Sequence, residues 1–259
     1  MPISETGIGY SDVTPDKQDG FRKYINLHIR ITQSTFSNFK SVYRYEKKYY
    51  YIDCTAGCGK DPLLLDGSPI IFKQSISKHN IDYSAYLIDC GEANCNDLSK
   101  IEMLTDKNIS IINDDYQNAV PKIFESTDKN IYGLLYIDPN GTPDFEFLEY
   151  VSRQKKKLDI LVRYNSTANK RARCAFDTGY DYLSSWVKKI DKKTIIIREP
   201  LPGDKHEWTF LFMTNAPSWG DWTKERFYDI KTPIGKQIFL KCDKTKKERL
   251  QQNDLFGVV

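Results

Sequence analysis

The chain has 259 residues, of which 40% are hydrophobic, so it can bury one substantial core without a second full domain. Its 38 Lys and Arg and 35 Asp and Glu give a net charge of +3, too small to identify a polyanionic partner from the total alone. No apolar run approaches the roughly 20 residues that cross a bilayer, and the N-terminus lacks the apolar stretch of a signal peptide. The sequence therefore predicts a cytoplasmic protein without membrane contact.

The chain offers six cysteines and three histidines as candidate thiolate and imidazole ligands for a metal such as zinc. Cysteine pairs 54/58 and 90/95 lack Cys-x-x-Cys spacing, so buried free thiols are the better interpretation and no metal site is predicted. The histidines lie in unlike contexts, which disfavours a Ser-His-Asp hydrolase.

In chain order, residues 1–20 are polar and are expected to form a flexible arm. Apolar residues then recur with a helical rhythm over 21–39, and further helices are expected at 145–153 and 180–189. Residues 226–259 are expected to form a basic C-terminal extension to a domain at 21–225. Short apolar runs predict seven strands, at 49–54, 83–89, 109–113, 131–138, 159–164, 194–198 and 208–214.

Strands covered on both faces appear in sequence as nearly continuous apolar runs. The fold class expected from these seven runs is α/β, with a Rossmann-like, mostly parallel sheet and helices on both faces.

A glycine-containing turn follows the first predicted strand, where Asp53 precedes Ala56, Gly57 and Gly59. Glycines at the end of a parallel strand let a nucleotide-like ligand approach the backbone, and Asp53 would orient one of its polar groups. A dinucleotide fingerprint needs a third glycine where Pro62 stands, and a P-loop fails at Cys54 and Asp61.

Acidic residues end the next two predicted strands. Asp89, with Glu92 as the substitute, could accept hydrogen bonds from both hydroxyls of a ribose, although a strand-ending Asp is more often a solvated cap. After the third strand, Asp115 is favoured over Asp114 to bind an adenine amino group, and Tyr116 could cover the ring. Adjacent acids are equally common in plain turns.

The fourth strand ends in Asp138, Pro139, Asn140 and Gly141. Proline fixes the backbone direction, and the Asp and Asn oxygens could accept hydrogen bonds from a substrate amino group.

With these motifs the chain resembles Rossmann-like S-adenosylmethionine-dependent methyltransferases over about residues 49–141. The three-Cys-motif partner family has the same order of motifs, here Tyr51-Ile-Asp-Cys-Thr-Ala-Gly-Cys-Gly59, Gly67-Ser-Pro69 and Asp138-Pro-Asn-Gly141. The ribosomal-RNA adenine-N6 methyltransferase family pairs such a loop with Asp-Pro-Pro-Tyr. In place of its Pro-aromatic pair, this chain has Asn140-Gly141, which removes a stacking aromatic from the motif.

The resemblance implies S-adenosyl-L-methionine as cofactor and methylation of an exocyclic amine, adenine N6 favoured, in DNA or RNA. Asp138, Pro139, Asn140 and Gly141 would form the catalytic pocket. The cofactor-binding residues would be Asp53, Thr55, Ala56, Gly57, Gly59, Asp89, Asp115 and Tyr116.

Basic clusters and aromatics late in the chain favour a nucleic-acid substrate. Candidate substrate residues are Arg163, Tyr164, Asn165, Arg171 and Trp219. Trp219 and Trp222 flank Gly220-Asp221 and are expected to be more exposed than Trp208. The alternatives are a methyltransferase of the same fold acting on a protein or small molecule, with a partner protein, and a non-catalytic module that binds cofactor or nucleic acid.

Overall fold

The computed structural model describes residues 14–38, 47–60, 65–139, 141–175, 183–200, 208–217 and 220–243. Contacts between Cα atoms divide the chain into two compact units. The first unit contains Met1–Asp138 and Gln154–Ile160, and the second contains Pro139–Arg153 and Leu161–Val259. Each unit is described by itself.

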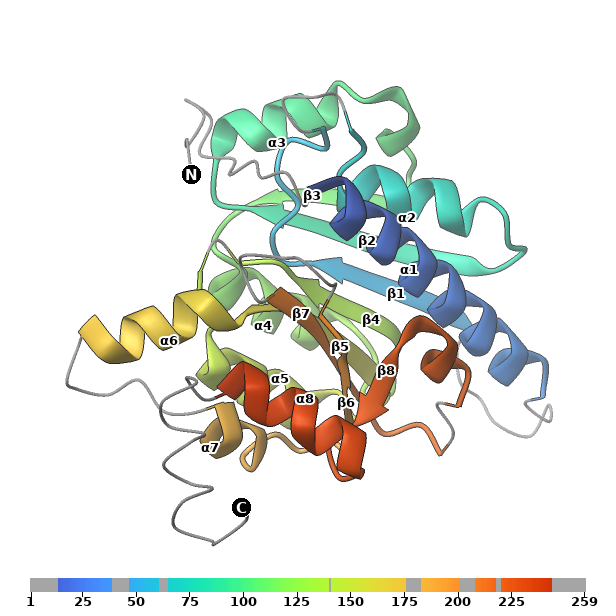
Figure 1. Ribbon diagram of the computed structural model, residues 1–259. Coiled ribbons are helices and arrows are strands. Elements are labelled where there is room, and N and C mark those ends of the chain that lie inside the picture. The colour runs from blue at the N-terminus through green and yellow to red at the C-terminus, as the bar shows by residue number, and fades with distance from the viewer. Residues whose placement is uncertain are drawn as a thin grey trace, which may run out of the picture. The chain divides into compact units, whose positions relative to one another are not determined.

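The first unit alternates strands and helices (Figure 1). In chain order its elements are α1 (Thr14–Ser37), β1 (Lys48–Asp53), α2 (Ser68–Ile76), β2 (Asp82–Asp89), α3 (Glu92–Ser99), the 3-10 helix η1 (Glu102–Leu104), β3 (Ile109–Asn113), α4 (Tyr116–Ser126) and β4 (Tyr132–Ile137).

Strands β1 to β4 of this unit are parallel, and β1 lies between β2 and β4. Asp53 at the end of β1 pairs with Leu87 on one side and Tyr136 on the other. The chain therefore runs outward from β1 through β2 to β3 and then returns to the other side of β1. In open α/β sheets, such a reversal leaves a ligand crevice at the carboxyl ends of the strands.

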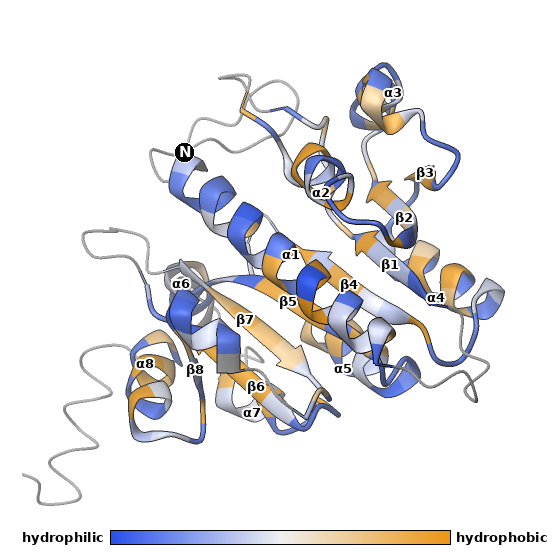
Figure 2. Ribbon diagram, turned by 90° about the vertical axis from the view of Figure 1, so that its right-hand side faces the viewer, coloured by the Kyte–Doolittle hydropathy of each residue, from blue (hydrophilic) through white to orange (hydrophobic). Residues whose placement is uncertain are grey.

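Helices cover both faces of these four strands. Figures 1 and 2 show α1 and α2 side by side on one face and α4 on the other. Helix α1 buries the aromatic rings of Phe21 and Tyr24 against the unit, and the Phe21 ring centroid lies 4.3 Å from that of Tyr136. Helix α1 begins at Thr14, so residues 14–20 form its first turns and not part of an arm. Residues 1–13 lie outside the described part of the chain.

The C-terminal end of α4 is closed by a buried lysine. Lys155 is 5% exposed, and its Nζ donates to the carbonyls of Phe124, Thr127 and Asp128 at 2.8, 3.1 and 2.8 Å. These three acceptors match the three N–H bonds of an ammonium group, so burial leaves none of them without a partner. Burial also lowers the pKa of Lys155.

The second unit contains four α-helices in its described residues and an antiparallel group of strands. In chain order its elements are α5 (Phe145–Gln154), most of β5 (Leu158–Asn165), α6 (Ser166–Ala175), α7 (Leu183–Val187), β6 (Thr194–Arg198), β7 (Trp208–Thr214), the 3-10 helix η2 (Gly220–Glu225), β8 (Phe227–Asp229) and α8 (Pro233–Asp243). All seven residues of β7 are buried, and Figure 2 shows the middle of this strand as hydrophobic.

The fold class is α/β as expected, but the sheet has eight strands instead of seven, in the order β3-β2-β1-β4-β5-β7-β6-β8. The additional strand is β8, whose three residues are too few to show an apolar pattern. It pairs antiparallel with β6, as does β7, so the sheet is mixed. Strand β8 and helix α8 lie within the expected C-terminal extension, whose residues 244–259 are outside the described part. In the described ranges, no helix combines the length and apolar character of a membrane span.

Candidate cofactor site

The turn after β1 is hydrogen-bonded to both neighbouring strands. Cys54 donates its backbone N–H to the carbonyl of Tyr136 in β4, and Ala56 donates to that of Ile88 in β2, each at 2.9 Å. The turn therefore lies at the carboxyl ends of three strands, where the chain reversal leaves a crevice.

Asp53 is fully buried and stabilises this turn from inside. Its Oδ2 accepts from the Tyr51 hydroxyl at 2.8 Å, and its Oδ1 accepts from the Thr55 backbone N–H at 3.2 Å. Burial raises the pKa of Asp53 to about 6, although hydrogen bonds from Ser68, Tyr51 and Thr55 act in the opposite direction. The carboxylate thus orients the loop backbone, whereas the sequence predicted that it orients the cofactor.

The two glycines of the turn have left-handed backbones in different surroundings. A Cβ at Gly57, whose φ is 63°, would meet no atom of the described residues within 4 Å. At Gly59, whose φ is 83°, a Cβ would lie 2.7 Å from Ile101 Cδ1. Gly67, which caps α2, donates its N–H to the Gly59 carbonyl at 2.7 Å. Gly59 and Gly67 close the turn against the protein, and Gly57 faces open space.

Asp89 connects this turn to the next loop. Its Oδ2 accepts from the Gly57 N–H at 2.9 Å, and its Oδ1 accepts from the Gly91 N–H at 2.8 Å and from Asn94 Nδ2 at 2.9 Å. The strand-end acid predicted from sequence therefore contacts the predicted glycine loop directly.

The acids after β3 have separate roles. Asp115 is the N-cap of α4 and accepts from the Gln117 N–H at 2.8 Å; its side chain is exposed, and Tyr116 begins the helix. Asp114 accepts from Lys122 Nζ at 2.9 Å, and that contact, followed by the one from Asn118, lowers its pKa. Of the two side chains, that of Asp115 is the more exposed, and its role toward a cofactor stays a prediction.

Asp138 lies beside the loop at the end of β4. Its backbone N–H donates to Thr55 Oγ1 at 2.8 Å, and its carboxylate, 12% exposed, forms an ion pair with Lys17 of α1. Asp138 and Asp53 are close enough that the charge of Asp138 contributes to the raised pKa of Asp53. The first unit thus brings Asp53, Thr55, Gly57, Asp89 and Asp138 to one edge of its strands.

The other residues of the Asp138 motif belong to the second unit. Asn140 lies outside the described residues, whereas Gly141 is half-buried. A Cβ at Gly141 would meet none of the described atoms within 4 Å.

The five residues predicted to bind substrate also belong to the second unit. Tyr164 is fully buried beside Asn169, and Arg163 lies with its guanidinium 5.6 Å from the centre of the Trp208 ring. Asn165 Oδ1 accepts from the Ala168 N–H at 3.0 Å at the start of α6. Arg171 is within α6, and Trp219 lies outside the described residues. Their contacts give packing and capping functions to three of the five.

Trp222 is buried, contrary to the expectation that it is more exposed than Trp208. Its exposed fraction is 1%, and its ring stacks on Phe212 with centroids 4.1 Å apart. The flanking Gly220-Asp221 pair belongs to η2, which turns the indole inward.

Two site residues were missed from the sequence. Lys17 falls in the expected arm, where no apolar rhythm signals a helix, and Asn94 is one polar residue of a polar helix. Gly91 was the available signal for Asn94, because a Cβ at this position would lie 3.0 Å from Asp89 Oδ1 and 3.1 Å from Asn94 Nδ2.

The geometry fits a nucleoside-bearing cofactor. Open space at Gly57 admits a ligand against the backbone, and Asp89 lies beside that backbone with Asp115 one strand further along.

No protein-family model matches the sequence, and no curated protein sequence matches it. Among solved structures, protein LPL1258 from Legionella pneumophila, assigned to DUF519, has a TM-score of 0.51 and 16% identity over 79% of this chain and 88% of that one. A putative O-methyltransferase from Klebsiella pneumoniae has a TM-score of 0.47 and 13% identity, over 82% of this chain and 85% of that one. An rRNA methylase from Streptococcus thermophilus has a TM-score of 0.41 and 14% identity, over 72% of this chain and 96% of that one. The likeness to LPL1258 shows a shared fold.

Proposed function

We propose that the chain is an S-adenosylmethionine-dependent methyltransferase that modifies an exocyclic amine of a nucleic acid, with adenine N6 favoured. The observation that supports this most strongly is the open backbone at Gly57, which donates its N–H to Asp89. Thr55, two residues earlier in the same turn, contacts Asp138. In such an arrangement one turn joins a ribose-binding acid to an amine-binding acid.

In this proposal the backbone of residues 55–59 holds the methionine part of the cofactor, Asp89 accepts from the ribose, and Asp115 with Tyr116 binds the adenine. Asp53 keeps the loop in shape from within, through Tyr51 and Thr55. The cofactor supplies an activated methyl group, because its sulfonium is a good leaving group.

The protein's own contribution to transfer is positioning. Asp138 would accept a hydrogen bond from the substrate amine and hold its lone pair toward the methyl group. Lys17 fixes the Asp138 carboxylate by an ion pair, while the bond from Asp138 N–H to Thr55 Oγ1 fixes its backbone. Both contacts hold the carboxylate in place before substrate binds, so that less side-chain entropy is lost on binding.

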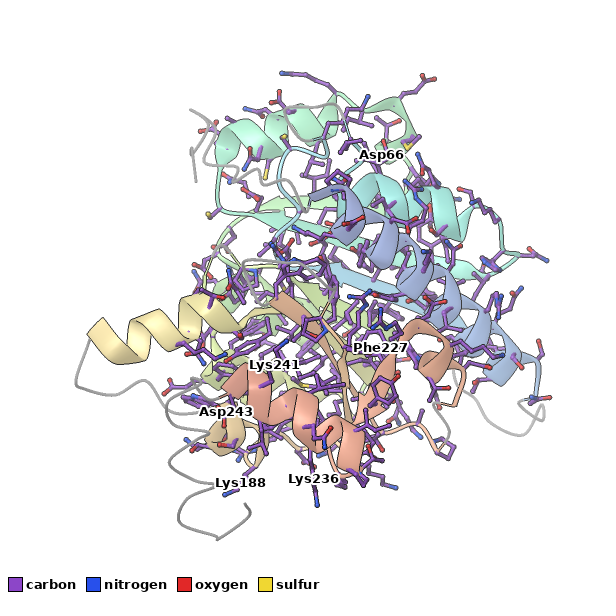
Figure 3. The ribbon with its side chains drawn as sticks, in the orientation of Figure 1. Asp66, Lys188, Phe227, Lys236, Lys241 and Asp243 are labelled. Atoms are coloured by element: carbon purple, nitrogen blue, oxygen red, sulfur yellow. The ribbon has the colours of Figure 1, made fainter. Side chains whose placement is uncertain are left out.

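The uneven charge of the two units supports a polyanionic substrate. The second unit has 20 Lys and Arg against 15 Asp and Glu, whereas the first has 18 against 20. Helix α6 has three basic residues and no acidic one, and Lys170 Nζ of α6 donates to the Lys241 carbonyl of α8 at 2.7 Å. Lys236 and Lys241 of α8 are exposed and are labelled in Figure 3. Phosphate groups are the partners that such a surface attracts.

Calorimetry with S-adenosylmethionine, followed by transfer of a tritiated methyl group to DNA, RNA and protein pools, tests the proposal. Asp138→Ala should bind the cofactor like the wild type but transfer no label. The control is Asp82→Ala, which should behave as wild type. Asp82 is exposed and begins β2, whereas Asp89 of the proposed site ends it. Simultaneous loss of binding and transfer in Asp138→Ala would show that Asp138 has been assigned the wrong role.

The pools also separate the alternatives. Label in protein would favour a protein substrate, and cofactor binding without label in any pool would favour a non-catalytic module. Absence of cofactor binding by the wild type would exclude the methyltransferase proposal altogether.

A further inference from the structure

The carboxylate of Asp89 already has three hydrogen-bond donors from its own chain. Gly57 N–H donates to Oδ2, and Gly91 N–H and Asn94 Nδ2 both donate to Oδ1. A carboxylate offers about four lone-pair positions, so about one remains free. The two hydroxyls of a ribose need two.

The three donors differ in their freedom to move. Gly57 N–H belongs to the turn that is bonded to β2 and β4, and Gly91 N–H belongs to the N-cap residue of α3. Asn94 is a half-buried side chain in the first turn of α3, and its amide can leave Asp89 by rotation about side-chain bonds. Its departure costs the least structural change.

We infer that Asn94 is the residue that competes with the cofactor ribose for Asp89, so that cofactor binding exchanges the Asn94 bond for a hydroxyl bond. This inference rests on the proposed function and makes Asn94 a determinant of cofactor affinity. Without a ligand, Asn94 satisfies and orients the carboxylate; with one, it yields its position on Oδ1.

The test uses S-adenosylhomocysteine and its 2′-deoxyribose analogue, titrated calorimetrically into wild type, Asn94→Ala and Asn94→Leu. Removal of the competing donor should tighten S-adenosylhomocysteine binding about fivefold, the value of one ordinary hydrogen bond. The deoxy analogue needs only the one free position, so its affinity should be equal in all three proteins. Asn96→Ala, an exposed asparagine of the same helix, is the control and should bind both ligands as wild type does.

Alanine and leucine are better helix formers than asparagine, so both variants are expected to fold. Unchanged or weaker S-adenosylhomocysteine binding by both variants would overturn the inference while leaving the cofactor site intact. An equal gain for both ligands would also overturn it, because the gain would not depend on the second hydroxyl. If the wild type bound neither ligand, the proposed function itself would fail.

Discussion

Gly57 and Gly59 share a left-handed backbone, but only Gly59 is packed against other side chains. An alanine in this conformation costs about 1 to 2 kcal/mol at either position. At position 59 its Cβ would also lie 2.7 Å from Ile101 and 3.0 Å from Leu98, so both side chains would have to shift.

We therefore expect alanine at position 59 to affect mainly the stability of the fold, and alanine at position 57 to affect mainly cofactor binding. Gly59→Ala should lower the free energy of unfolding by more than Gly57→Ala does. Gly57→Ala should lower cofactor affinity at least tenfold, because its methyl group enters the open space. Urea denaturation and calorimetry on each variant measure the two effects. Normal cofactor binding by Gly57→Ala would mean that the ligand does not approach this backbone.

Asp53 predicts a pH dependence of stability. Its pKa is about 6 in the folded protein against 3.8 for the unperturbed group, so the folded state binds the proton more tightly than the unfolded state. The free energy of unfolding should therefore fall as pH rises from about 4 to about 6, by about 3 kcal/mol at roughly 1.4 kcal/mol per pKa unit.

The measurement is urea denaturation of wild type and Asp53→Asn at several pH values from 4 to 7. The asparagine does not titrate. The free energy of unfolding of the wild type should therefore fall relative to that of Asp53→Asn as the pH rises across this window. Parallel pH profiles would show that Asp53 has an ordinary pKa in the folded protein.

The residue scale also limits what could be predicted about the site. Asp89 and Asp138 could be located because acids that end parallel strands lie at one edge of the sheet. The inward direction of Asp53 was missed, although Tyr51 is two residues earlier and therefore on the same face of β1. Lys17 could not be found, because its contact with Asp138 joins residues that the sequence separates by several elements of unknown path. Asn94 lies only five residues after Asp89, and Gly91 between them was its one available signal.

At the scale of elements, apolar runs predicted strands of five residues or more and missed the three-residue strand β8. The predicted strand at 109–113 agrees with β3, and those at 194–198 and 208–214 agree with β6 and β7. Strand β8 is formed by pairing with β6, which is a tertiary contact without a local signal. The first turns of α1 were assigned to an arm because they are polar.

Helices α6 and α8 form the surface on which the nucleic-acid proposal can be tested. Lys236→Glu combined with Lys241→Glu should weaken binding of a short labelled RNA about tenfold and reduce its salt dependence, because fewer phosphate contacts release fewer counterions. Fluorescence anisotropy at several salt concentrations measures both quantities.

The matched control for that pair is Lys78→Glu combined with Lys107→Glu, which reverses two exposed lysines of the first unit. RNA affinity should fall less in this control, and cofactor affinity should be unchanged in both double variants. Equal losses of RNA affinity would indicate a general effect of net charge in place of a defined surface.

At the scale of the whole molecule, the strand order combines two kinds of β structure. The parallel strands β1 to β4 hold the proposed cofactor residues, and the antiparallel strands β6 to β8 belong to the more basic unit. Overall composition gave no indication that the charge is divided unevenly, because the net charge of +3 is the sum of one acidic and one basic unit. Charge counted over the whole chain thus underestimates the attraction of one unit for polyanions.

The buried Lys155 can report local unfolding at the C-terminal end of α4. Its ammonium is enclosed and bonded to three carbonyls, so acetic anhydride should acetylate the exposed lysines of the native protein and leave Lys155 unmodified. Acetylation at this position, read by peptide mass spectrometry, would report molecules in which the end of α4 has separated from its cap. The fraction acetylated over time would then report that local opening at a residue the protein already contains.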